Sequence, residues 1–193
     1  MVIRLMRRLV LRLSPGELLR DRRGVSAVEF ALILPLMLLL YAGSVEISEA
    51  LAVDRKVNQL ASTVGDLVSQ RATINTVEVN NIFNAGTAIM EPYSTTSVKV
   101  MVAAVNIVSA SSQKVAWAVA KNDTAPATGA NSPIAIPEAI ATVGSQVIVT
   151  RVRYTFVSPF ADFMAGITGK SSYAFEHVFM MRPRLGETIT WES

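Results

Sequence analysis

The chain has 193 residues, a formal net charge of +3 and no cysteine, so a disulfide framework and a thiolate metal site are excluded. The positive charge lies at the start, because residues 1–24 hold seven arginines against Glu17 and Asp21 (+5), which leaves −2 for residues 25–193. The bulk of the chain is slightly acidic, and the basic balance gives little support to nucleic-acid binding.

An apolar segment follows this basic leader, and Glu29 is its only charged residue from Val25 to Val45. As a helix, about 21 residues span roughly 30 Å, which matches the hydrocarbon core of a bilayer. Its apolar side chains favour insertion by about 5 kcal/mol, more than the roughly 3 kcal/mol that a central carboxylate costs. We expect a transmembrane helix over 25–45, with a cytoplasmic leader (1–24) and an extracytoplasmic remainder because the arginines precede the span.

Three interpretations of this segment are open. The first is an uncleaved signal anchor for an extracytoplasmic binding or scaffold protein. The second is a secretory signal peptide cut at Ala42-Gly43-Ser44, although the apolar run exceeds the usual 7 to 15 residues. The third follows from the order of basic leader, Gly24, four residues, Glu29, Phe30 and apolar run. This order resembles the processing site of type IV pilin-like proteins, which a prepilin peptidase cuts after the glycine.

The chemistry of the third interpretation is coherent. Gly24 is small and permissive enough to enter a protease site, and cleavage there gives Val25 a free ammonium group. Glu29 lies four residues further along, about one helical turn away. Two unpaired charges in lipid are costly, whereas an ammonium–carboxylate pair within one helix or between two subunits costs much less. We therefore expect Gly24 and Val25 to form the processing site, and Glu29 with Phe30 to set subunit register.

The stretch RRGVSAVEFALILPLMLLLYAGSVEISEAL (22–51) resembles the N-terminal signature of the TadE-like family of tight-adherence pilus proteins. The matching features are Arg22-Arg23-Gly24, Ala27 to Ala31, the Leu34-Pro35 step, the leucine run and Gly43. A C-terminal MMRPRLG (180–186) is also similar to this family.

The resemblance implies a pseudopilin, a minor pilin-like subunit of a tight-adherence or type IV-like pilus that acts in adhesion and secretion. The implied partners are a prepilin peptidase, other pilin and pseudopilin subunits with their assembly machinery, and membrane lipid. The implied location is the bacterial inner membrane, with a single pass, and incorporation into the pilus stays open. A TadE-like or a TadF-like role, and a place in, on or before the fibre, also stay open.

Beyond the span, residues 46–70 predict an extension of the same helix. Apolar residues recur at spacings of three and four, which is typical of a helix seam. The seam either packs onto the chain's own C-terminal domain or contacts other subunits, and its residues are Val53, Val57, Leu60, Val64 and Leu67.

Residues 71–193 predict an extracytoplasmic α+β domain. We expect helices at 77–90 and near 159–165, and a polar, Pro- and Gly-containing loop at 121–137. The β-rich stretches 97–108, 114–120, 146–157 and 172–182 predict four antiparallel strands. The fold class is therefore α+β: a long N-terminal membrane-spanning helix followed by a small antiparallel-sheet, pilin-like domain.

Little in the chain predicts catalysis, a cofactor or a metal. His177 is the only histidine, and its strand position favours a half-exposed sheet residue over a general base. Glu46 and Glu49 are interpreted as a solvated helix face, and Trp117 and Trp191 as packing or interfacial residues. We expect a structural protein and no enzyme.

Overall fold

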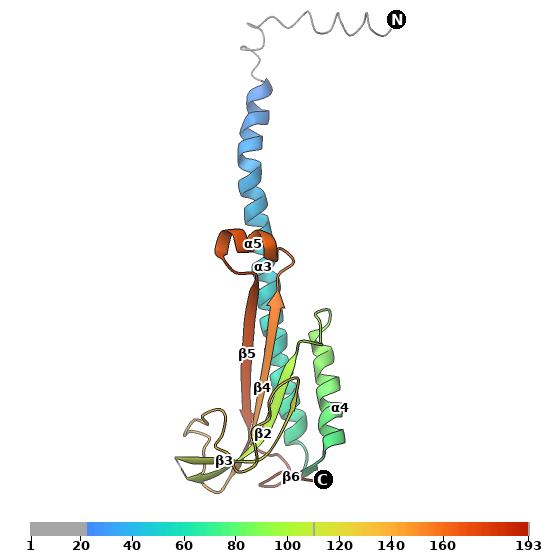
Figure 1. The fold of residues 1–193 in the computed structure, drawn as a ribbon, viewed down its shortest axis with the longest axis vertical. Helices are drawn as coiled ribbons and strands as arrows, with labels where there is room; N and C mark the ends of the chain where they lie inside the picture. Colours follow the sequence, from blue (N-terminus) through green and yellow to red (C-terminus); the bar gives the residue numbers. More distant parts are fainter. Residues whose placement is uncertain (1–22, 110, 193) are drawn as a thin grey trace, which may run out of the picture. The chain divides into compact units, whose positions relative to one another are not determined.

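The computed structural model describes residues 23–109 and 111–192. The described residues fall into two compact units that divide between Val45 and Glu46, called here the N-terminal and C-terminal units. Most of the predicted leader, with six of its seven arginines, lies outside the described residues. Helix α3 (Arg23–Ser69) begins in the first unit and ends in the second, so the expected long helix is present (Figure 1).

The C-terminal unit has α+β content, as the sequence predicts. After α3 come strand β1 (Thr73–Ile74), helix α4 (Thr76–Thr87) and the 3₁₀ helix η1 (Ala88–Met90). Strands β2 (Lys99–Ser109), β3 (Ser112–Lys121) and β4 (Gln146–Val157) follow. Helix α5 (Ala161–Thr168) joins β4 to β5 (Ser172–Met181), and the short β6 (Thr190–Trp191) comes last.

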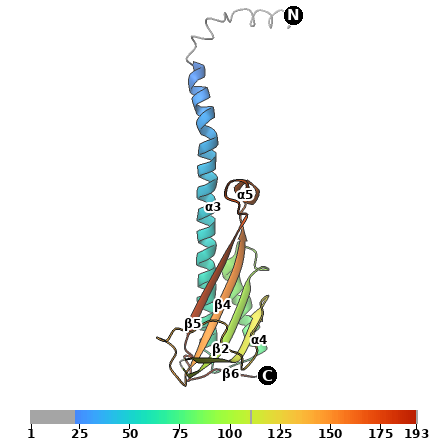
Figure 2. The same ribbon diagram turned by 60° about the vertical axis from the view of Figure 1, so that its left-hand side comes forward.

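Four strands form an antiparallel sheet in the order β3-β2-β4-β5 (Figure 2). The register between β4 and β5 is unbroken from Ile148 opposite Met181 to Val157 opposite Ser172. The pairing of β2 with β3 contains irregularities at Ala104/Val105 and Ile107/Ser109. Strands β1 and β6 form a separate parallel pair, which the sequence did not predict.

The helix side of the sheet carries the main hydrophobic core. Alternate residues of β4 reach it, namely Ile148, Val152, Tyr154 and Phe156, because successive side chains of a strand point to opposite faces. They pack with α3 and α4, whose own contributions include Val57, Leu60, Val79, Ile82 and Phe83.

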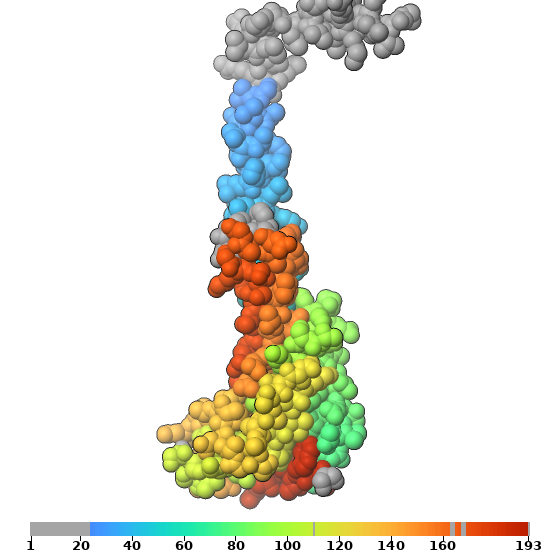
Figure 3. Space-filling view, in the orientation of Figure 1, coloured from blue at the N-terminus to red at the C-terminus, as the bar shows by residue number. Residues whose placement is uncertain are grey.

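A second core lies on the opposite face, and the alternation of β4 alone did not predict it. Val147 and Val149 of β4 pack there with Met101 and Ile107 of β2, and Ile136 of the loop after β3 covers them. This loop, yellow to gold in Figure 3, lies over that part of the C-terminal unit. Both faces of the sheet are therefore buried at one end.

Two glycines let α3 approach its neighbours closely. A Cβ at Gly86 of α4 would lie 2.8 Å from Val64 Cγ2 and 2.9 Å from Leu60 Cδ1. A Cβ at Gly65 of α3 would lie 3.1 Å from Thr150 Oγ1 and 3.2 Å from Phe179 Cδ1. The C-terminal half of α3 is thus held between α4 and the sheet at van der Waals distance.

Candidate functional site

The N-terminal unit presents an apolar helical surface. Among the described residues, α3 is the one helix long and apolar enough to cross a membrane by length and composition. Every residue from Gly24 to Tyr41 is exposed, including large side chains such as Leu32 (75% exposed), Leu40 and Tyr41. An aqueous environment would disfavour such a surface, whereas lipid would not. The segment suggests a single-pass membrane anchor.

The predicted processing residues lie at the first turn of α3. Gly24 is exposed, and a Cβ built on it meets no described atom within 4 Å. Val25 is 52% exposed. A larger side chain at Gly24 would therefore find open space within this chain.

The predicted register residues follow within the next turn. Glu29 and Phe30 are both exposed on α3, and Phe30 is 59% exposed. Because residues four apart in a helix lie one above the other, Glu29 shares a face with Val25. Within the described chain neither residue is covered by another element, so both face whatever surrounds this helix.

The predicted seam lies in the C-terminal unit, where the chain itself covers it. Val53, Val57, Leu60 and Val64 are fully buried in the main core, and Leu67 is partly buried against it. The pattern allowed either packing onto the chain's own C-terminal domain or contact with other subunits. These side chains pack onto the chain's own domain.

A polar row joins α3 to β5, and sequence reasoning missed it. Glu46 is 2% exposed, and its Oε1 accepts a 2.7 Å hydrogen bond from the hydroxyl of Tyr173. This bond, followed by burial, raises the pKa of Tyr173. Asp54 Oδ1 lies 2.7 Å from Nε2 of His177. The interpretation of Glu46 as part of a solvated face is wrong, because β5 covers this residue.

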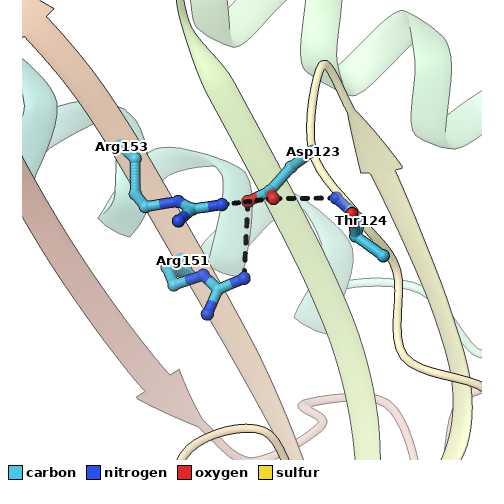
Figure 4. Close-up of polar contacts among 4 residues, drawn as sticks. All are labelled: Asp123, Thr124, Arg151 and Arg153. Atoms are coloured by element: carbon cyan, nitrogen blue, oxygen red, sulfur yellow. Dashed lines mark hydrogen bonds and ion pairs between the residues drawn. The ribbon is translucent and has the colours of Figure 1, made fainter.

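Asp123 ties the loop after β3 to the outer face of β4 (Figure 4). Its carboxylate is 4% exposed and contacts the guanidinium groups of Arg151, at 3.4 Å, and Arg153. The backbone N–H of Thr124 donates to it at 2.7 Å. Burial alone would raise the pKa of Asp123, but the Thr124 hydrogen bond and the two arginines outweigh burial and lower it.

Beside it, Asn122 adopts a left-handed φ of 56° and donates to the carbonyls of Thr96 and Val98. Trp117 and Trp191 also pack against each other, with ring centroids 5.5 Å apart. These contacts hold the unit together and place no nucleophile beside a base. Among the described residues, no group of three or more His, Asp or Glu side chains could hold a metal ion.

Among known proteins, a family model matches one part of the chain. No curated protein and no solved structure matches the chain. The family model described as TadE-like protein matches residues 24–66, which span the exposed apolar helix and most of the seam. The TadE-like family is a pilus-associated family and not a family of enzymes, so the match supports a role in the context of tight-adherence pili. The resemblance seen in the sequence is confirmed, and residues 24–66 form a TadE-like segment.

Proposed function

We propose that this protein is a minor pilin-like subunit, a pseudopilin, that acts in the assembly of a tight-adherence pilus after a prepilin peptidase cuts behind Gly24. The observation that carries the proposal is the start of the TadE-like match at residue 24, between the basic leader and the exposed apolar helix. Residues 25–45 would span the inner membrane, with residues 1–24 in the cytoplasm and residues 46–70 and 71–193 outside it.

The exposed residues of α3 support an assembly role. The large apolar side chains of residues 25–41 are exposed in the described chain, so they can contact lipid in the membrane and neighbouring subunits in a fibre. The seam from Val53 to Val64 is buried and unavailable for such contacts. Subunit register would therefore depend on the N-terminal unit, where Glu29 could pair with the ammonium group of Val25 in the same chain or in a neighbour.

The test is the N-terminal sequence of the protein extracted from membranes that contain active prepilin peptidase. The wild type should begin at Val25. Gly24→Leu should keep Met1, because the bulky residue does not fit the peptidase, while no described atom of this chain lies within 4 Å of a Cβ there. Gly43→Leu is the matched control, since a Cβ there also meets no described atom within 4 Å, and it should begin at Val25 like the wild type.

Two outcomes contradict the proposal. An intact Met1 in the wild type would indicate an uncleaved signal anchor for an extracytoplasmic binding or scaffold protein. A start at Gly43 or Ser44 would indicate a secretory signal peptide.

A further inference from the structure

The two edges of the four-stranded sheet differ in protection. The first part of the β3 edge is covered by the loop that follows it: Val115 N–H donates to Ala130 O at 2.9 Å, and Ser132 N–H donates to Gln113 O at 2.9 Å. At the other edge, β5 pairs with β4 alone (Figure 1). In the described chain, no backbone hydrogen bond joins the free side of Ser172–Met181 to any other segment.

Strand β5 also lacks several of the devices that usually protect a sheet edge. Such devices include prolines, lysines, bulges and short strands, besides other charged side chains. Strand β5 is ten residues long, contains neither proline nor lysine, and keeps an unbroken register with β4. Its charged or titratable residues are Tyr173, Glu176 and His177. Glu46 of α3 engages Tyr173, and Asp54 of α3 engages His177. The free edge is thus a regular row of backbone donors and acceptors.

Two exposed apolar residues of α3, Ile47 and Leu51, lie on the helix side of this edge. Asp54 contacts His177 of β5, so the Asp54 face of α3 is turned toward β5. Ile47 and Leu51 come seven and three residues before Asp54 and share that helical face. Ile47 is 64% exposed and Leu51 is 51% exposed. A strand added to β5 would place its inward side chains over these two residues.

We propose that the free edge of β5 is a docking site for an extended segment of another protein, which adds a fifth strand to the sheet. Strand addition satisfies the unpaired backbone groups, and pockets for alternate side chains supply specificity. The segment would carry apolar residues at alternate positions toward Ile47 and Leu51. It would carry a basic residue on the other face, opposite Glu176. This inference does not depend on cleavage after Gly24.

The charge requirement follows from the sheet register. Glu176 is exposed and lies opposite Arg153 in the ladder. Arg153 is engaged by Asp123, and Glu176 has no ion pair within the described residues. A basic residue across the free edge would supply a favourable cross-strand pair.

A second copy of this chain fits the edge poorly in antiparallel pairing. The loop after β3 covers the edge of β3 at Gln113–Val115, so pairing along a whole free edge between two copies would be β5 against β5. Each Glu46 is bound to Tyr173, near the start of its own β5. Full antiparallel pairing would then place the two Glu46 residues at opposite ends of the paired strands. Glu46 directly follows the predicted span, so two copies anchored in one membrane could not pair in this way.

The experiment uses the full-length protein in detergent micelles and a synthetic peptide as the probe. The peptide QVIVTRVRYTFV copies residues 146–157, the native antiparallel neighbour of β5, and combines alternate apolar residues with arginines. Hydrogen exchange should slow at least about tenfold at alternate amides of β5 and stay unchanged in β3. A scrambled peptide of the same composition should leave both strands unchanged.

Three variants sharpen the measurement. Ile47→Lys and Glu176→Lys should each weaken peptide binding about five- to tenfold, the first by placing a charge under the added strand and the second by repelling its arginines. Val77→Lys on α4 is the control, because Val77 is 68% exposed and lies on another element, and it should bind as the wild type does.

Several results would overturn the proposal. These are equal protection by the scrambled peptide, binding without protection of β5, no saturable binding, and equal loss of affinity in Val77→Lys. Protection of β5 without peptide, together with a dimer in the micelle, would assign the edge to a second copy and would also refute it.

Discussion

At the scale of single residues, Glu29 is unusual because it is a carboxylate on an exposed, otherwise apolar helical surface. Its insertion cost is small beside the apolar gain of the segment, so the membrane tolerates it without requiring it. A role of Glu29 in assembly therefore requires a positively charged partner. The ammonium group that cleavage would create at Val25 lies one helical turn away and could be that partner.

We predict that Glu29→Ala is processed normally and fails in pilus assembly. The change lies five residues beyond Gly24, so the cut should survive, while the Val25 ammonium group loses its partner in lipid. Glu29→Gln should fail similarly because it keeps the shape and removes the charge. Immunoblot mobility reports processing, and the yield of surface pili reports assembly. Normal pilus yield from processed Glu29→Ala would refute a register role.

Asp123 gives a prediction on stability and pH. Asp123→Asn should lower the free energy of unfolding by about 1–3 kcal/mol, because Arg151 and Arg153 lose their ionised partner. Asp162→Asn, at an exposed position, is the control and should change it by less than about 0.5 kcal/mol. Denaturant unfolding of the full chain in micelles measures both.

The pH dependence has a definite sign. The pKa of Asp123 is lower in the folded protein than in the unfolded chain, where it is about 3.9. Its stabilising contribution is therefore complete above about pH 4 and is lost as the pH falls through the folded-state pKa. The difference in stability between the wild type and Asp123→Asn should be constant near neutral pH and shrink in acid. A difference that grows in acid would contradict the assigned shift.

At the scale of elements, the C-terminal half of α3 is a core helix. It is buried between the sheet and α4, and Gly65 and Gly86 permit the close approach on each side. Its heptad-like spacing therefore reflects packing inside one chain and not a coiled coil between chains. Other residues of the same helix, such as Ile47 and Leu51, stay exposed.

We predict that Val57→Asp destabilises the C-terminal unit by at least about 3 kcal/mol. Val57 is fully buried in the main core, and an ionised carboxylate there would have no partner. Asn58→Asp introduces the same side chain at the next, exposed position and should be nearly neutral. Limited proteolysis and thermal unfolding compare the two. If Val57→Asp resists protease as the wild type does, the seam is not buried.

At the scale of the whole molecule, the proposed cleavage changes the charge of the protein. The full chain has a net charge of +3, and residues 1–24 contribute +5, so the chain from Val25 onward carries −2 before its new ammonium group is counted. Removal of the leader also removes the arginines that would hold the N-terminus in the cytoplasm.

We predict that processing moves the isoelectric point from about 9.4 to the acidic side. Isoelectric focusing of membrane extracts, with and without active prepilin peptidase, should separate the two forms. Gly24→Leu should focus with the unprocessed form under both conditions. A basic isoelectric point in the wild type with active peptidase would show that the leader is retained.

Much of this architecture could be predicted from local patterns. The apolar run and its arginines predict a membrane helix because lipid selects for length and hydropathy alone. Strand alternation predicts the β4 residues of the main core because successive side chains point to opposite faces. The residue order around Gly24 and Glu29 predicts the TadE-like match because that signature is contiguous in the sequence.

Only the tertiary structure decided the features that join distant segments. The burial of Glu46 depends on Tyr173, and the contact of Asp54 depends on His177, more than 100 residues away in each case. The choice between an internal and an external seam depended on where the sheet and α4 lie. The free edge of β5 could not be predicted either, since strand order and loop cover are set by long-range packing and leave no periodic signal in the strand itself.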